Sequence, residues 1–115
     1  MAVVAAEKGT KTAVIGTEHE LLNVAEAGVY TFEVDCNKLV AGDTVELRIY
    51  KMILTGGTPR VYIFEPIPGA QPTDGQVFIS EAISNELTDA KSLQFTLKQT
   101  AGTGREFPWK VLRHS

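Results

Sequence analysis

Residues 29–35 (VYTFEVD) and 44–50 (TVELRIY) alternate apolar and polar side chains at every step. In an extended strand, a period of two places the apolar side chains on one face and the polar ones on the other. The alternation returns in residues 92–98 (SLQFTLK), near the other end of the chain. These three stretches predict amphipathic strands of an antiparallel β-protein.

Short segments of the same kind, separated by glycine, proline and polar residues, run through the rest of the 115 residues. Turns at a spacing of roughly 8–12 residues are typical of sandwiches and barrels. Parallel sheets need a long crossover connection, usually a helix, and no segment has that pattern. We therefore expect one all-β domain, a single antiparallel β-sandwich of about seven or eight short strands.

The two ends of the chain carry expectations of their own. Residues 1–10 are small and apolar and then polar, with too little bulk to anchor a core. We predict that they form an N-terminal arm, flexible or in contact with a partner, although an edge strand also fits, and that residues 11–115 form the sandwich. In the last predicted strand, Pro108 lacks the N–H that a ladder needs, so this strand should lie at an edge or carry a bulge.

Composition limits the partners. The formal net charge is -3 and the sequence pI is about 5.3, which argues against nucleic acid, because phosphate binding needs a basic surface. No apolar run reaches the roughly 18 residues of a membrane span, and the N-terminus lacks the basic leader of a signal peptide. We expect a protein that is synthesised in the cytoplasm and binds neither nucleic acid nor membrane.

Three motifs resemble chemical sites at first sight. Glu18-His19-Glu20 holds three potential metal ligands, but on a strand His19 points away from the two carboxylates. Cys36 is the single cysteine, and neither histidine offers it an obvious base. Residues 102–105 (GTGR) lie between two strand patterns, where a hairpin turn is expected instead of a phosphate loop. We expect no catalytic, cofactor-binding or metal-binding residues.

Apolar residues on both faces of a strand suggest a second buried side. In residues 61–64 (VYIF), Tyr62 and Phe64 share one face and both faces are apolar. Tyr50 and Met52 show the same pattern on the preceding strand. A subunit contact and a fuller internal core both explain it. Together with the first apolar residues and the proline-rich segment 66–75, this gives the candidate contact residues Val3, Val4, Tyr50, Met52, Tyr62, Phe64, Ile67 and Pro68.

Three segments resemble small structural proteins of tailed bacteriophages and prophages: residues 27–35 (AGVYTFEVD), Leu39 with 41–48 (AGDTVELR), and 95–109 (FTLKQTAGTGREFPW). The resemblance covers about half the chain. It implies a non-enzymatic virion protein with a jelly-roll-like sandwich, most simply a capsid cement or decoration protein that stabilises the phage head by binding across capsomers. It also implies the major capsid protein and further copies of the chain, as homodimer or homotrimer, as partners on the capsid surface. It transfers no individual functional residue.

Two other functions fit the same sequence. A neck or tail component of the virion would share the fold and the origin. A carbohydrate-binding sandwich would use an exposed aromatic platform, for which Trp109 and Tyr62 are the candidates.

Overall fold

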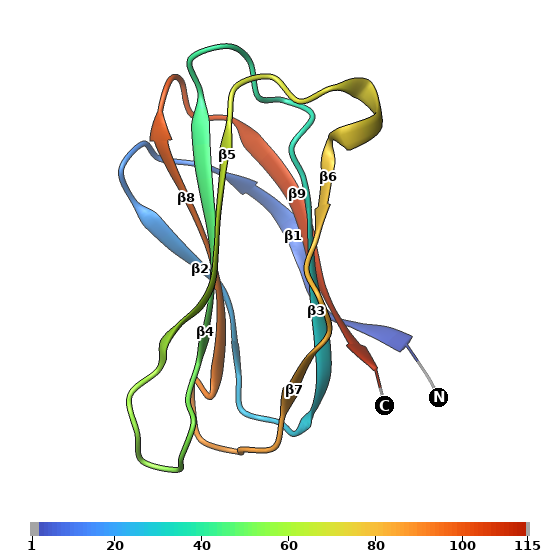
Figure 1. Cartoon of the computed structure of the whole chain (residues 1–115), viewed down its shortest axis with the longest axis vertical. Helices are drawn as coiled ribbons and strands as arrows, with labels where there is room; N and C mark the ends of the chain where they lie inside the picture. The colour runs from blue at the N-terminus through green and yellow to red at the C-terminus, as the bar shows by residue number, and fades with distance from the viewer. Residues whose placement is uncertain (1–2, 115) are drawn as a thin grey trace.

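The computed structural model describes residues 3–114 as two antiparallel β-sheets packed face to face (Figure 1). None of these residues forms a helix that is long and apolar enough to cross a membrane. A short 3-10 turn spans Thr73–Gly75. The strands are β1 (Val3–Thr12), β2 (Glu18–Val24), β3 (Gly28–Asp35), β4 (Thr44–Lys51), β5 (Arg60–Pro68), β6 (Val77–Ile79), β7 (Ile83–Asn85), β8 (Leu93–Ala101) and β9 (Glu106–His114).

The strand order is that of a jelly roll. Sheet A has the order β1-β9-β3-β6, and sheet B has the order β2-β8-β4-β5, so the chain passes back and forth between the two sheets. The strands β6 and β7 pair with successive parts of β3 and share one position at that edge. The predicted antiparallel sandwich is confirmed. Residues 3–114 form nine strands where about seven or eight were expected, because one edge strand is interrupted.

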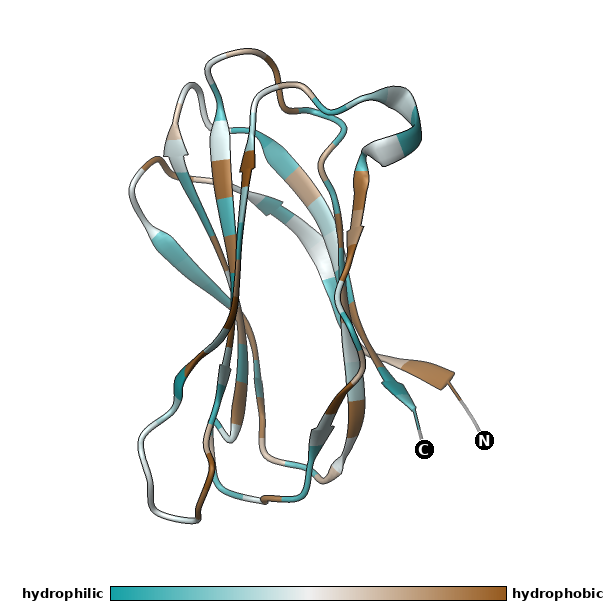
Figure 2. Ribbon diagram, in the orientation of Figure 1, coloured by the Kyte–Doolittle hydropathy of each residue, from teal (hydrophilic) through white to brown (hydrophobic). Residues whose placement is uncertain are grey.

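The alternating stretches fill the space between the sheets. The inward-facing apolar side chains of these stretches are 0–1% exposed, and hydrophobic and hydrophilic colours alternate along β4 (Figure 2). The Phe32 and Phe95 rings pack across the interior with their centroids 5.3 Å apart. Burial of so many side chains supplies the main favourable term of folding. The core residues of these stretches are Tyr30, Phe32, Val34, Val45, Leu47, Ile49, Leu93, Phe95 and Leu97.

The segment predicted as an arm is a strand. Residues 3–12 form β1, which pairs with β9 from Val3 opposite His114 to Thr12 opposite Glu106. The sandwich therefore includes residues 3–10, as the edge-strand alternative predicted. Met1 and Ala2 lie outside the described residues. A bulge between Ala5 and Glu7 interrupts the ladder, so β1 is regular only in its second half.

The prediction for the last strand was wrong, since β9 lies between β1 and β3 in the middle of sheet A. Pro108 is tolerated there because the last pair of the ladder with β3 is Trp109 opposite Val34, so the ladder does not extend to residue 108. On its other side Pro108 pairs with Thr10 of β1. The missing N–H therefore points to the side where the β3 ladder has already ended.

Candidate interaction surface

The β4–β5 hairpin carries the largest group of exposed apolar side chains among the described residues. Ile53 and Leu54, in the loop, are 70% and 73% exposed. Figure 2 shows hydrophobic residues on the loop and along the neighbouring part of β5. Exposed apolar side chains that gather on one hairpin often mark a contact site. We call it the hairpin surface, and it consists of Ile53, Leu54, Val61, Tyr62 and Phe64.

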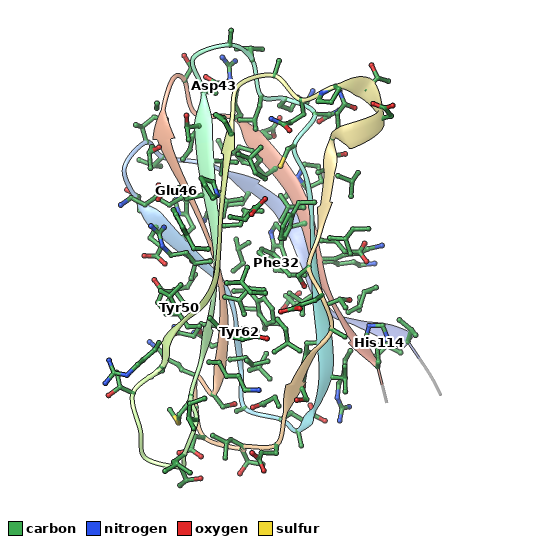
Figure 3. The ribbon with its side chains drawn as sticks, viewed as in Figure 1. Phe32, Asp43, Glu46, Tyr50, Tyr62 and His114 are labelled. Carbon is green, nitrogen blue, oxygen red and sulfur yellow. The ribbon has the colours of Figure 1, made fainter. Side chains whose placement is uncertain are left out.

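A β-bulge divides the two aromatic residues of the hairpin surface. Ile49 pairs with Ile63 and Tyr50 pairs with Val61, which leaves Tyr62 as the extra residue. The Tyr62 hydroxyl donates a 3.0 Å hydrogen bond to Glu81 Oε1, in the segment that joins β6 to β7 of the other sheet (Figure 3). This hydrogen bond raises the pKa of Tyr62. The expectation that Tyr62 and Phe64 share one face is therefore wrong.

Phe64 is held on the outer face of sheet B by an arginine. It pairs with Arg48 of β4, whose guanidinium carbon lies 4.8 Å from the centroid of the Phe64 ring. Arg48 Nη2 also donates to Glu46 Oε1 at 2.8 Å. The arginine is fixed between a carboxylate and a ring, so the half-exposed ring of Phe64 has a defined position.

Tyr50 is only partly available to a partner. It lies on the outer side of sheet B (Figure 3), where its hydroxyl donates a 2.6 Å hydrogen bond to Glu18 Oε2. Thr96 Oγ1 donates to the same oxygen at 2.7 Å. Burial, together with the Glu18 carboxylate, raises the pKa of Tyr50 to about 12. The hydroxyl is committed to a network that joins β2, β4 and β8.

Two of the predicted contact residues belong to the interior. Met52 is 6% exposed, because the chain leaves the strand after Lys51 and the loop folds back so that the side chain lies beside Gly57. Ile67 is 9% exposed, because β5 continues through the proline-rich segment and its alternation turns this side chain inward. Partner contact by these two residues is excluded in the folded chain. Pro68 is exposed at the end of β5, and Val3 and Val4 are half-exposed at the start of β1.

β5, at one edge of sheet B, and β1, at one edge of sheet A, differ in their backbone. Pro66 and Pro68 of β5 lie opposite Glu46 and Thr44 of β4. A proline has no N–H to donate, so these positions direct their backbone away from β4, toward the outer edge of the sheet. Prolines at such positions prevent another strand from adding there. β5 therefore presents side chains at its edge and few backbone donors.

The outer edge of β1 keeps its donors. Thr10 pairs with Pro108, which cannot donate, so the Thr10 N–H points away from β9. The Ala13 N–H donates to the Arg105 carbonyl at 2.9 Å, which places the odd-numbered amides on the β9 side. The Lys8 N–H, on the outer side, donates only to the adjacent Glu7 Oε1, at 3.1 Å. The amides of Lys8 and Thr10 are therefore directed outward.

An ion pair between Asp43 and Arg105, which sequence reasoning missed, forms a clamp that joins the ends of β1 and β5. Asp43 is 2% exposed and accepts hydrogen bonds from Arg105 Nε at 2.8 Å and from the backbone N–H groups of Val40 and Thr103 (Figure 3). The hydrogen bond from Arg105 is the largest of the effects that lower the pKa of Asp43. The Asp43 carbonyl accepts from Gly69, next to β5, and the Arg105 carbonyl accepts from Ala13, next to β1.

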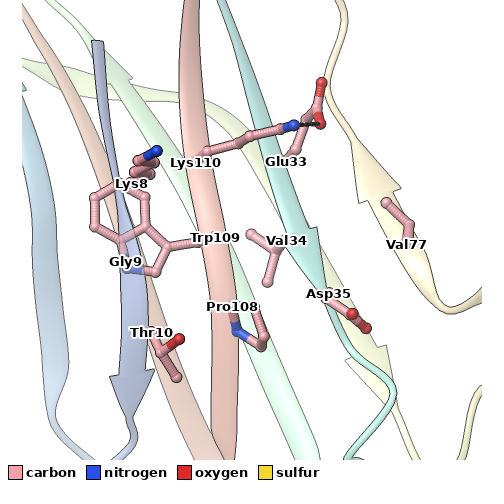
Figure 4. Close-up of a pocket in the computed structure, with 10 residues that line it drawn as sticks. All are labelled: Lys8, Gly9, Thr10, Glu33, Val34, Asp35, Val77, Pro108, Trp109 and Lys110. Atoms are coloured by element: carbon pink, nitrogen blue, oxygen red, sulfur yellow. Dashed lines mark ion pairs between the residues drawn. The ribbon is translucent and has the colours of Figure 1, made fainter. Parts of the chain in front are cut away.

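An open depression of about 600 Å³ lies across sheet A (Figure 4). Residues of β1, β9, β3 and β6 line it, and Lys110 Nζ lies 3.5 Å from Glu33 Oε1 at its rim. Trp109 also lines the depression and packs against the core. The depression combines apolar surface with a few charged groups.

The motifs that resembled chemical sites have structural roles. His19 Nε2 accepts the Val14 N–H at 3.0 Å, whereas Glu18 accepts from Tyr50 and Thr96. No group of three metal-ligating side chains occurs among residues 3–114. Cys36 is buried, and burial raises the pKa of its thiol to about 12, so the thiol stays protonated at neutral pH. Residues 102–105 form the turn between β8 and β9.

No protein-family model, curated protein or solved structure matches this chain. The resemblance of residues 27–35 and 95–109 to phage structural proteins stays a prediction. The geometry of the hairpin surface and of the two edge strands supports the proposals that follow.

Proposed function

We propose that the chain is a non-enzymatic structural protein of a tailed-phage virion. In this proposal it is a cement protein on the capsid surface that stabilises the head by binding across capsomers, with the major capsid protein and further copies of itself as partners. The hairpin surface is the observation that carries the proposal, because its exposed side chains are mainly apolar and suit contact with another protein.

The energetics of the hairpin surface suit a protein shell as partner. Fully burying an aliphatic or aromatic side chain of this size is worth about 1.5–3 kcal/mol. Most of this free energy is still available to a binding partner at Ile53 and Leu54, since both are at least 70% exposed in the isolated chain. Phe64, held by Arg48, loses little conformational freedom on binding, as is typical of aromatic anchor residues.

The fold supports the same function. A jelly roll is a rigid double sheet, and viral capsid proteins and lectins are among the proteins that use it. A cement protein needs such a rigid body, a surface that adheres to the shell and a means of self-association. The hairpin surface supplies the second requirement, and the outer edge of β1 is available for the third.

The test uses phage heads that lack the protein, to which the purified chain is added. We expect the chain to bind at many sites over the shell and to protect heads against heat or chelator. The double variant Leu54→Ser/Phe64→Ser should reduce the number of bound copies severalfold. Val14→Ser is the matched control, because Val14 is 60% exposed but lies in a different loop. Full binding by the double variant, or a single ring of copies at one vertex, would contradict the cement function, and the ring would indicate a neck or tail component.

Carbohydrate binding is the second candidate, and the depression beside Trp109 is the feature that favours it. Its lining combines apolar and charged residues, and ligand sites use such a combination. The chain has one tryptophan, so soluble glycans that enter the depression should change its fluorescence. A panel of glycans that leaves the fluorescence of Trp109 unchanged would count against this function.

A further inference from the structure

The regular part of the outer β1 edge is short and has a defined centre. The bulge between Ala5 and Glu7 leaves residues 7–12 as the regular stretch, and this stretch contains no proline. Its sequence is EKGTKT. Among the described residues, no strand lies beyond β1 in sheet A. An edge of this kind is a template for a further strand.

Symmetry restricts how two copies of this edge could pair. Two identical antiparallel neighbours are related by a twofold axis perpendicular to the sheet, so one residue must lie opposite its own copy. If that residue is Lys8 or Glu7, like charges face each other directly, which is unfavourable. If it is Gly9, Glu7 of each copy lies opposite Lys11 of the other copy. Pairing about Gly9 therefore creates two opposite-charge pairs.

The backbone groups agree with the same centre. In pairing about Gly9, Lys8 lies opposite Thr10 of the other copy, and these are the residues whose amides point outward. Their N–H and C=O groups are placed to form reciprocal hydrogen bonds. The Lys8 N–H would exchange the Glu7 carboxylate for a carbonyl of the other copy. That exchange frees Glu7 to face Lys11.

Gly9 suits the position on the axis. Gly9 lies opposite Trp109 of β9. The Trp109 Nε1 is 3.6 Å from the place where a Cβ on Gly9 would stand. The Trp109 indole therefore packs over Gly9 within the same chain. At the twofold axis the two Gly9 residues would be neighbours, each next to the indole of its own chain, and no side chain at position 9 would hold the two strands apart.

We propose that two copies of the chain associate through β1, antiparallel and centred on Gly9, so that their A sheets join into one continuous sheet. The outward amides of Lys8 and Thr10 supply the hydrogen bonds of this pairing. The charge complementarity between Glu7 and Lys11 favours this register over one centred on Thr10, in which Glu7 and Lys11 do not face each other. The pairing does not depend on the phage assignment. Purified protein is sufficient to test it, so its failure and the failure of capsid binding are distinguishable.

The first test measures molar mass against concentration by light scattering and sedimentation. The wild-type mass should rise from 12.5 kDa toward twice that value as concentration increases. Thr10→Pro removes an outward N–H without touching the β9 ladder, so this variant should stay at the monomer mass. Thr10→Val is the matched control, because it keeps the amide, and it should associate like the wild type. A monomeric wild type, or a Thr10→Pro variant that associates as tightly as the wild type, would overturn the proposal.

The second test reverses the charges. Glu7→Lys or Lys11→Glu alone places like charges opposite each other twice per dimer and should raise the dissociation constant about tenfold. The double variant Glu7→Lys/Lys11→Glu restores opposite charges and should return the constant to within about threefold of the wild type. If the double variant is as weak as the single ones or weaker, the register about Gly9 is wrong.

Discussion

The edge strands β1 and β5 offer contrasting ways of meeting another protein. β5 and its hairpin expose apolar side chains, but Pro66 and Pro68 remove backbone donors from the edge. β1 exposes mostly small and charged side chains, but its outward backbone donors are intact. Side-chain contacts adapt to a foreign surface, whereas backbone pairing suits a strand of matching length and register. We interpret the two edges as specialised for different partners.

The largest expected effect separates buried from exposed residues within β5. Ile67→Ala should lower the free energy of unfolding by about 2–4 kcal/mol, because it opens a cavity in the core. Phe64→Ala should cost about 1 kcal/mol or less, since it removes a half-exposed ring and one contact with Arg48. Urea unfolding of both variants measures the difference. Equal losses would mean that β5 does not alternate as described.

The next effect tests which amides of β1 face β9. Gly9→Pro should lower the free energy of unfolding by about 2 kcal/mol, because the Gly9 N–H points toward Trp109 and its loss breaks the ladder. Thr10→Pro should cost less than about 1 kcal/mol, since that N–H points outward. The comparison is made at a low concentration, where association does not contribute. The reverse order of the two losses would show that the outward amides have been assigned to the wrong residues.

A smaller effect concerns the clamp at the ends of both strands. Arg105 holds the pKa of Asp43 below its ordinary value of 3.8, so the stabilisation is present above that pH and is lost as the pH falls through the lowered pKa. Acid unfolding curves of Asp43→Asn should therefore depend less on pH than those of the wild type between about pH 5 and pH 2. Asp74→Asn, in the exposed 3-10 turn, is the control and should keep the wild-type dependence. An unchanged slope in Asp43→Asn would contradict the role of the clamp.

The core could be predicted from the sequence because it depends on local alternation. Phe32, Leu47 and Phe95 are inward in the structure as the period of two requires. The position of β9 could not be predicted in this way, because it depends on β1 adding beyond it, and strand neighbours follow from long-range packing. Pro108 indicated an edge, and only the early end of the β3 ladder explains its place in a central strand.

The candidate contact surface was predictable only in part. Phe64 and the first valines are exposed as expected, but alternation failed where β4 ends and where Tyr62 forms a bulge. Neither feature leaves a clear signal in the residues themselves. Ile67 was predicted as a contact residue because it lies in the proline-rich segment, although an edge strand tolerates prolines whose nitrogen points outward.

Hydrogen exchange at the β1 amides tests most directly the claim that β1 meets its partner through outward backbone groups. We expect the amides of Gly9 and Lys11 to be protected at every concentration, because they face β9. The amides of Lys8 and Thr10 should exchange rapidly in dilute protein and become protected as the concentration rises from about 1 µM to about 1 mM. Exchange of Lys8 and Thr10 that stays equally rapid over this range would contradict the account.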